Sequence, residues 1–409
     1  MTIGSWVMGL AIAFASVLWV ELVRDIYHTL SHLWQPLYRL HVWHHKVFRR
    51  DLSAVSETIY RQAHWYNDVP ESLVMLSLSA LPWLLTRNWN FSPQWAVWTG
   101  SLYTFAFLLG AIARGLGIPF IDELTDVTHR PGEFTNLPAR WFVNRPYHWR
   151  HHFDNQNAYF SGTLTIVDKL MGTALSLKNK RIAVTGASGT LGKALLTQLH
   201  LAGAKVTALT SSETEIKLNI KGEEVAVKTL SWQTGRESEL RSQLEKIDIL
   251  ILNHGIDVNK RRDEEAIAKS YEINTFSSLR LMDLFFTTFK SDRDLVRKEV
   301  WVNTSEAEVN PAFSPLYELS KRAMGELVTL RRLDAPCVVR KLILGPFKSN
   351  LNPVGVMSPD WVAKQIVNLA KRDVRNIIVT INPLTFILFP IKEFLTANYF
   401  RWFTSNKSK

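Results

Sequence analysis

The sequence contains a single cysteine, Cys337, among 409 residues. A disulfide framework and a zinc site built from cysteines are therefore excluded. Charged residues make up only 21% and hydrophobic residues 46%, which excludes a disordered chain. The mean hydropathy of −0.03 excludes a protein that is membrane from end to end. The net charge of +11 comes without a nucleic-acid motif, so we expect no nucleic-acid partner; attraction to an anionic membrane surface fits this charge better.

Histidine is almost missing from the second half of the chain. Ten of the 12 histidines lie within the first 152 residues, and most of them form the clusters HTLSH (28–32), HVWHH (41–45) and HWRHH (148–152). On a helix, positions three or four apart share one face, so each cluster can aim two or three imidazoles at one point. Neutral imidazole is a good ligand for iron, zinc or copper, and these clusters predict a transition-metal site. The isolated His64 is left without a role.

Three apolar stretches, residues 3–23, 72–85 and 94–113, predict membrane helices. The first lacks the basic start of a cleaved signal peptide, which is the alternative interpretation. The second is short for a full span, so we expect it to be tilted or partly inserted. Basic residues follow the first stretch and place that side in the cytoplasm. We therefore expect an integral membrane protein with its histidines, and both catalytic sites, on the cytoplasmic side.

The character of the chain changes near residue 178. Short apolar segments then alternate with helical patterns, as in RIAVTG (181–186), KVTALT (205–210) and IDILIL (247–252), which is typical of a parallel sheet with crossover helices. We predict an all-α membrane domain with about three to four membrane helices, followed by an α/β Rossmann-like doubly wound domain. The expected ranges are 1–177, 178–381 and an apolar-aromatic segment, 382–409, that either lies at the membrane interface or packs on its own domain.

The histidine clusters resemble those of the fatty acid hydroxylase/sterol desaturase superfamily over about residues 3–173. YHTLSHLWQPLYRLHVWHH (27–45) resembles its first two histidine boxes, RPYHWRHHFDNQNAYFSGTLTIVDKLMGT (145–173) its last box, and the His of THRPGEFTNLP (128–138) its single intervening histidine. The resemblance implies two iron ions, with zinc as a possible substitute, and oxidation of an unactivated C–H bond of a lipid by dioxygen with electrons from an unknown donor. Asp122 and Asp126 are either partners of these imidazoles or solvated loop residues. The implied metal ligands are His28, His32, His41, His44, His45, His129, His148, His151 and His152.

The segment TGASGTLG (185–192) follows an expected strand and opens an expected helix. Glycines at such a turn let the backbone approach the pyrophosphate of a dinucleotide at the helix N-terminus. In LYELSK (316–321), Tyr317 and Lys321 are four residues apart on a helix, a spacing that lets the ammonium lower the phenol pKa while the phenol transfers a proton. Strand KVTALT ends without an aspartate for a ribose 2′-hydroxyl, and its Ser and Thr residues favour NADP(H) over NAD(H).

These motifs resemble the short-chain dehydrogenase/reductase family over about residues 178–381. The resemblance implies catalytic roles for Tyr317, Lys321, Ser305 and Asn274. One departure stands out: in VNTSEAE (302–308) Ser305 precedes the usual serine position, which Glu306 occupies, so either residue can fill it. The implied cofactor-binding residues are Thr185, Gly186, Ser188, Gly189, Thr190, Leu191, Gly192, Asn253, Gly255 and Lys321.

The two halves together resemble bifunctional sterol desaturase/short-chain dehydrogenase proteins of cyanobacteria. The resemblance predicts a membrane-bound lipid oxidoreductase in which the metal site hydroxylates or desaturates a lipid and the second domain interconverts the alcohol and the carbonyl with NADP(H). In the alternative, only one half is catalytic: a hydroxylase with a binding module for NADP(H), or a reductase anchored by the membrane half.

Overall fold

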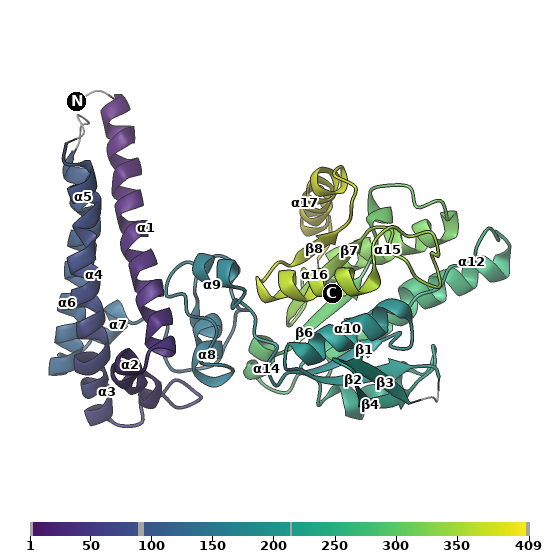
Figure 1. The fold of residues 1–409 in the computed structure, drawn as a ribbon, viewed down its shortest axis with the longest axis horizontal. Coiled ribbons are helices and arrows are strands. Elements are labelled where there is room, and N and C mark those ends of the chain that lie inside the picture. Colours follow the sequence, from purple (N-terminus) through teal and green to yellow (C-terminus); the bar gives the residue numbers. More distant parts are fainter. Residues whose placement is uncertain (1–2, 89–93, 213–214, 406–409) are drawn as a thin grey trace. The chain divides into compact units, whose positions relative to one another are not determined.

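A computed structural model of the chain describes residues 3–88, 94–212 and 215–405 (Figure 1). The chain divides into two compact units, 1–174 and 175–409, three residues before the expected boundary. Unit 1 is helical and unit 2 is built around one sheet. The architecture is the predicted one, a helical region with apolar helices followed by a Rossmann-like domain.

Unit 1 consists of helices and their connections, the longest of which within the described residues spans 126–144 between α7 and α8. Helix α1 packs along α4 and α6, and the three form an elongated group in Figure 1. Its helices are α1 (Ile3–Leu33), α2 (Gln35–Val47), α3 (Glu57–Ala63), the π-helix η1 (His64–Asp68), α4 (Val69–Ser79), α5 (Leu81–Thr86), the 3-10 helix η2 (Gln94–Trp98), α6 (Thr99–Leu116), α7 (Ile121–Thr125), α8 (Arg145–Phe153) and α9 (Ile166–Met171).

Within the described ranges, three helical stretches are long and apolar enough to cross a membrane: Ile3–Leu33, Glu57–Thr86 and Gln94–Leu116. The second is longer than expected, because α3, η1, α4 and α5 follow one another as one helical run of 30 residues. The apolar segment 72–85 is thus part of a helix with enough length for a full span, and the expectation of a short span was wrong.

Unit 2 contains an eight-stranded sheet in the order β3-β4-β2-β1-β5-β6-β7-β8. All neighbouring strands are parallel except β3 and β4. The order reverses direction between β1 and β5, and ligands of open α/β sheets bind at the carboxyl ends of the strands at such a point. The strands are β1 (Arg181–Thr185), β2 (Lys205–Thr210), β3 (Ile216–Ile220), β4 (Glu223–Ser231), β5 (Ile249–Leu252), β6 (Glu299–Asn303), β7 (Val338–Leu344) and β8 (Asn376–Val379).

Helices cover both faces of this sheet. Leu195 of α10 and Ile366 of α16 belong to one buried core, and Phe285 of α13 and Val328 of α15 belong to the other. The helices of unit 2 are α10 (Thr190–Leu201), the 3-10 helix η3 (Glu237–Leu240), α11 (Arg241–Leu244), α12 (Glu264–Tyr271), the π-helix η4 (Glu272–Phe276), α13 (Ser277–Phe286), α14 (Asp292–Arg297), the 3-10 helix η5 (Glu306–Glu308), α15 (Pro315–Arg331), α16 (Pro359–Lys371) and α17 (Thr385–Phe403).

The C-terminal helix α17 packs on unit 2 along one narrow face. Thr385, Phe389 and Glu393, four residues apart, are buried, and Glu393 pairs with Lys341 at 2.7 Å and with Arg332 at 2.9 Å. Most of its other large apolar side chains are exposed, although the helix is not among the candidate membrane spans. The exposed residues are Phe386, Ile387, Leu388, Ile391, Phe394, Leu395, Tyr399, Trp402 and Phe403.

Candidate functional site

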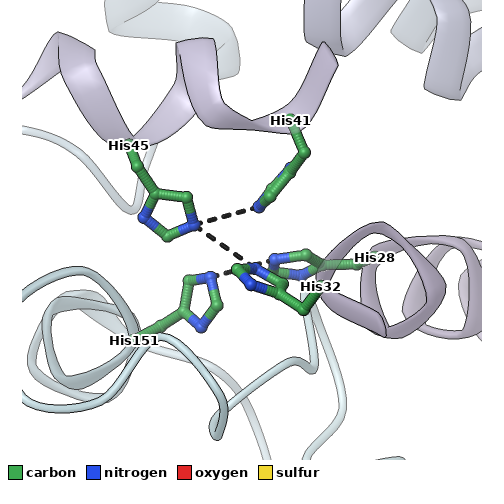
Figure 2. A group of neighbouring side chains, drawn as sticks. All are labelled: His28, His32, His41, His45 and His151. Carbon is green, nitrogen blue, oxygen red and sulfur yellow. Dashed lines mark hydrogen bonds between the residues drawn. The ribbon is translucent and has the colours of Figure 1, made fainter. Parts of the chain in front are cut away.

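The structure brings together all nine histidines of the expected metal set, in two groups within unit 1. In each group, one ring nitrogen of every histidine lies within 4.8 Å of those of the others. Figure 2 shows the first group, with rings from α1, α2 and α8 that point toward one another. The first group consists of His28, His32, His41, His45 and His151, and the second of His44, His129, His148 and His152.

Helical spacing explains how three short clusters supply two groups. On α2, His41 and His45 are one turn apart and face the first group, whereas His44 lies on the adjoining face and joins the second. On α8, His148 and His152 share the second group in the same way. Helix α8 begins where it does because the side chain of Asn144 accepts a hydrogen bond from the N–H of Tyr147.

The outer nitrogens of several rings are fixed by hydrogen bonds. Nδ1 of His28 lies 2.6 Å from the carbonyl oxygen of Phe160, and Nδ1 of His151 lies 2.8 Å from that of Ala158. A carbonyl only accepts, so each Nδ1 carries the proton and each Nε2 keeps its lone pair. This tautomer, fixed by an outer hydrogen bond, is usual for histidines that bind a metal.

The inner Nε2 atoms lie close together. In the first group the distance is 3.0 Å from His28 to His151, and in the second it is 2.8 Å from His129 to His148. Two ligands at ~2.1 Å from one ion and at right angles to each other are separated by about 3 Å. Burial also lowers the pKa of His41 to about 4, so its imidazole is neutral at physiological pH. These donors fit two transition-metal ions, one at each group.

The sequence analysis missed two residues that contact histidine side chains, Asn67 and Asp68, and left open whether Asp126 does so. Nδ1 of His41 lies 2.8 Å from Oδ1 of Asn67, which belongs to the π-helix η1; such helices are frequent at functional sites. Asp126 accepts from Nδ1 of His129 at 2.8 Å and is therefore an imidazole partner, whereas the side chain of Asp122 lies outside the described residues. His64 joins neither group and instead contacts Asp68 at 2.6 Å.

The second site lies in unit 2, where β1 leads into α10. Gly186 has φ +61°, and a Cβ on Gly192 would lie 2.2 Å from the carbonyl oxygen of Gly186. Both positions therefore require glycine, and Gly189, at the N-cap of α10, leaves the first-turn N–H groups without a capping side chain. A cradle of this kind fits the pyrophosphate of a dinucleotide.

Ser305, Tyr317 and Lys321 form a connected set beyond the carboxyl end of β6. The Ser305 hydroxyl accepts from the N–H of Ala307 at 3.1 Å and lies beside the Tyr317 phenol, and Nζ of Lys321 lies 5.8 Å from the centre of the Tyr317 ring. Burial raises the pKa of Tyr317 to about 12 and lowers that of Lys321 to about 8. A buried phenol in contact with a hydroxyl and near an ammonium can exchange a proton with a substrate alcohol.

Glu306 points away from this set. Its carboxylate accepts hydrogen bonds from Thr380 at 2.6 Å and from Thr385 at 3.2 Å. Of the two residues that sequence reasoning left open for the serine position, Ser305 is therefore the one that contacts Tyr317. Ser305, which precedes the usual serine position of the family, lies in the connection between β6 and η5.

The other expected residues surround the same edge of the sheet. Asn274 accepts from the N–H of Ile256 at 2.8 Å and donates to its carbonyl at 3.0 Å, so it fixes the chain after β5. A Cβ on Gly255 would lie 3.0 Å from Asn274 Oδ1 and 3.6 Å from Lys321 Nζ. Oγ1 of buried Thr185 accepts from the N–H of Asn253 at 2.8 Å.

Three of the expected cofactor residues lie along the turn itself. Ser188 accepts from Thr210 at the end of β2, where the structure describes Ser211 and Ser212 but not Glu213 and Thr214. Thr190 opens α10, and the side chain of Leu191 is buried in the core, so only its backbone can face a ligand.

Comparisons with known proteins match a family model to the C-terminal half and a curated relative to nearly the whole chain. The family model of short chain dehydrogenase matches residues 180–337. Among solved structures, a short chain dehydrogenase from Burkholderia cenocepacia in complex with NADP is 19% identical and covers 56% of this chain and 100% of its own, with a TM-score of 0.45. One from Sphingobium yanoikuyae in complex with NADPH is 15% identical, covers 56% and 98%, and has a TM-score of 0.45.

A curated relative matches the whole chain. The monoglucosyldiacylglycerol epimerase of Synechocystis sp. is 63% identical over 404 residues, which cover 98% of this chain and 98% of the relative. The match thus includes the helical unit with its histidines as well as the sheet. The chain belongs to the family of this epimerase, and its C-terminal half is a short chain dehydrogenase domain.

Proposed function

We propose that the protein is an NADP(H)-dependent epimerase whose substrate is a membrane glycolipid, monoglucosyldiacylglycerol. The observation that carries the proposal is the Tyr317 phenol with the buried Ser305 and Lys321 beside it, at the sheet edge next to the glycine turn. The name of the relative that matches nearly the entire chain supplies the substrate.

Inversion at a sugar carbinol carbon requires that its unreactive C–H bond be broken and made again on the other face. A bound nicotinamide supplies a reversible acceptor for the hydride of that bond. In our proposal, Tyr317 takes the hydroxyl proton and returns it, while Ser305 holds the substrate oxygen and Lys321 holds the nicotinamide ribose. Both the proton and the hydride return to the substrate, so no net oxidation occurs. Because the hydride returns to the opposite face of the transient ketone, the configuration of that carbon is inverted.

The substrate is a lipid, and several features suit a protein that works at its surface. Unit 1 has three candidate membrane spans, and unit 2 carries the exposed apolar residues of α17. A helix with apolar residues and flanking basic residues such as Arg401 can lie in the interface of a bilayer. Basic residues that follow the first span, such as Arg49 and Arg50, support a cytoplasmic position for both sites.

The test is reconstitution of the full chain in nanodiscs that contain monoglucosyldiacylglycerol and NADP+. We expect an epimeric hexose after the headgroup is released and identified by chromatography. Tyr317→Phe is expected to lower the rate at least about 100-fold, because proton transfer by a positioned group contributes that much. Unchanged glucose in the wild-type reaction, with NADP+ bound, would refute the proposal.

A second candidate function rests on the nine converging histidines. We propose that they hold two metal ions, iron in the active form, with zinc as a substitute on overexpression. Two irons in such a site supply dioxygen activation for the oxidation of an unactivated C–H bond. In this proposal the histidine unit hydroxylates or desaturates a lipid with electrons from a separate donor, and the dehydrogenase domain acts on the resulting alcohol.

The second candidate function requires a different assay. It requires dioxygen and an electron donor, whereas epimerisation is redox-neutral and requires neither. We therefore expect that mass spectrometry of the lipids under air, with a reductase system added, shows a gain of oxygen or a loss of two hydrogens that disappears in His151→Ala. Identical lipid masses under air and under nitrogen would leave epimerisation as the function of the chain.

A further inference from the structure

Unit 1 contains a cavity of about 420 Å³ that lies against both histidine groups. His28 and His41 of the first group and His44, His129 and His148 of the second contribute to its wall. Its size is within the range of small-molecule sites, which is about 300–1,000 Å³. Whatever occupies the cavity is therefore placed directly beside the candidate metal ligands.

The wall of this cavity carries many charged and polar side chains. Among the described residues that line it, Phe107 and Val127 are the only ones with large hydrocarbon side chains. Four carboxylates also line it: Asp25, Asp68, Glu71 and Asp126. A fatty acyl chain in this space would exclude water from the carboxylate oxygens that lack a protein donor, which is costly.

Several of these carboxylate oxygens have no protein donor. Within the described part of the chain, the carboxylate of Glu71 makes no hydrogen bond or ion pair. Asp25 is only 4% exposed; one of its oxygens accepts from the N–H of Gly162 at 2.8 Å, and the other has no partner among the residues that the structure describes. A carboxylate oxygen without a protein donor calls for a donor from a ligand or from water.

The two arginines of the cavity each pair with a carboxylate, although the buried Nε of each makes no hydrogen bond among the described residues. Arg24 pairs with Glu21 at 2.6 Å and donates to Thr163 at 2.6 Å. Arg114 pairs with Asp68 at 3.2 Å and donates to Thr125, also on the wall, at 2.9 Å. With four carboxylates against two arginines, the cavity wall carries more negative than positive side chains. This balance disfavours a phosphate or carboxylate ligand and suits a neutral ligand with several hydroxyl groups.

The cavity wall also includes charged residues at the ends of the three apolar stretches of the sequence. Asp25 follows the apolar stretch 3–23, Glu71 immediately precedes 72–85, and Arg114 immediately follows 94–113. Charged residues at the borders of membrane spans mark the boundary between hydrocarbon and headgroup layers. A lipid bound there presents its headgroup to the cavity and keeps its acyl chains in the bilayer.

We propose that this cavity is a binding site for the polyhydroxylated headgroup of a neutral glycolipid, so that the histidine groups face sugar carbons. The inference takes its lipid, monoglucosyldiacylglycerol, from the proposed function. It departs from what the hydroxylase resemblance implies, because the group beside the histidines is the sugar and the acyl chain remains outside.

Two photoreactive forms of monoglucosyldiacylglycerol test this inference with the full chain in nanodiscs. One carries a diazirine on the sugar ring and the other carries it at the end of an acyl chain. We expect the sugar probe to label peptides of α1 and α6 around Asp25 and Phe107, and the acyl probe to label other positions. Labelling of the cavity wall by the acyl probe alone, or labelling by the sugar probe only in unit 2, would overturn the inference.

Variants make the test specific to the free carboxylates. Glu71→Leu removes the acceptors at similar volume and is expected to lower labelling by the sugar probe about tenfold or more, the usual effect of one hydrogen bond to a charged group. Glu71→Gln keeps one acceptor oxygen and is expected to retain part of the labelling. The control is Glu57→Gln, which changes an exposed carboxylate paired with Arg61 outside the cavity.

Metal content measured by elemental analysis accompanies each variant. We expect Glu71→Leu to retain the metal content of the wild type, and a parallel loss of metal and labelling would assign Glu71 to support of the histidines, against the inference. If Glu71→Leu does not fold, Asp25→Asn provides the same comparison. Tyr317→Phe separates the two proposals: it is expected to stop epimerisation and to leave labelling of the cavity intact.

Discussion

The carboxylate of Asp168 and the imidazole of His28 are connected through one residue, Phe160. The N–H of Phe160 donates to Oδ1 of Asp168 at 2.8 Å, and its carbonyl oxygen lies 2.6 Å from Nδ1 of His28. Asp168, fully buried, also accepts from the hydroxyl of Tyr147 and from the N–H of Ser161, both at 2.8 Å. One carboxylate thus fixes the loop whose carbonyl orients a candidate metal ligand.

Asp168→Asn is therefore expected to weaken metal binding although Asp168 touches no metal ligand. The amide keeps one acceptor oxygen and places an NH2 group against a backbone N–H and a hydroxyl, so the loop at Phe160 shifts. Loss of an outer partner of a metal ligand typically lowers metal affinity about 10- to 100-fold. Chelator competition on purified protein measures the change, with Glu133→Gln, an exposed loop carboxylate, as control. Equal affinities for Asp168→Asn and the wild type would contradict this role.

The fold could be predicted from the sequence because its strongest patterns are local. Six β-branched segments became β1, β2, β5, β6, β7 and β8, and the three apolar stretches lie in the candidate spans. The hairpin of β3 and β4 was missed, because its turn at Lys221 and Gly222 is a short signal within a charged segment. For the segment of α17, the sequence left open a position at the membrane interface or packing on its own domain. One narrow face of α17 packs on unit 2, and most of its other large apolar side chains are exposed.

The candidate sites, like the fold, could be predicted from the sequence only where the pattern is local. The nine histidines were found because helical spacing alone brings imidazoles onto common faces. Asn67 and the carbonyl of Phe160 reach His41 and His28 through tertiary packing, which no local pattern encodes. Spacing also left open whether Ser305 or Glu306 faces Tyr317, and the answer depends on the partners of Glu306, Thr380 and Thr385, more than 70 residues along the chain.

Gly189→Ala is expected to abolish cofactor binding and leave the fold intact. A Cβ on Gly189 would meet only the carbonyl oxygen of Gly186, at 3.2 Å, so the backbone tolerates it with a small shift. The added methyl group would occupy the space in front of α10 where a pyrophosphate must approach. Fluorescence titration with NADPH checks the affinity and circular dichroism the fold, with Ser238→Ala as control. A Gly189→Ala variant that binds NADPH like the wild type would place the cofactor elsewhere.

NADPH affinity is expected to fall above pH 8. The pKa of Lys321 in the protein without cofactor is lowered to about 8 by burial, so the ammonium loses its proton above that pH. Cofactor binding favours the charged form if Lys321 holds the ribose, and affinity then weakens by up to about tenfold per pH unit, the limit for one linked proton. Titrations from pH 6 to 10 measure the slope. Lys321→Arg stays charged over this range and is expected to flatten it; an equal slope in both proteins would exclude Lys321 as the titrating group.

Helix α17 is expected to lie in the headgroup region of the bilayer. The exposed apolar residues of α17 would otherwise face water, and its buried contacts through Glu393 hold it on unit 2. A nitroxide on Leu395→Cys measures its depth, because the natural Cys337 is buried and does not compete for the label. We expect the label about 5–10 Å below the lipid phosphates, as for other interfacial helices, and a label on Ser238→Cys to remain in water. Equal collision rates of both labels with a water-soluble relaxation agent would show instead that α17 stays off the membrane.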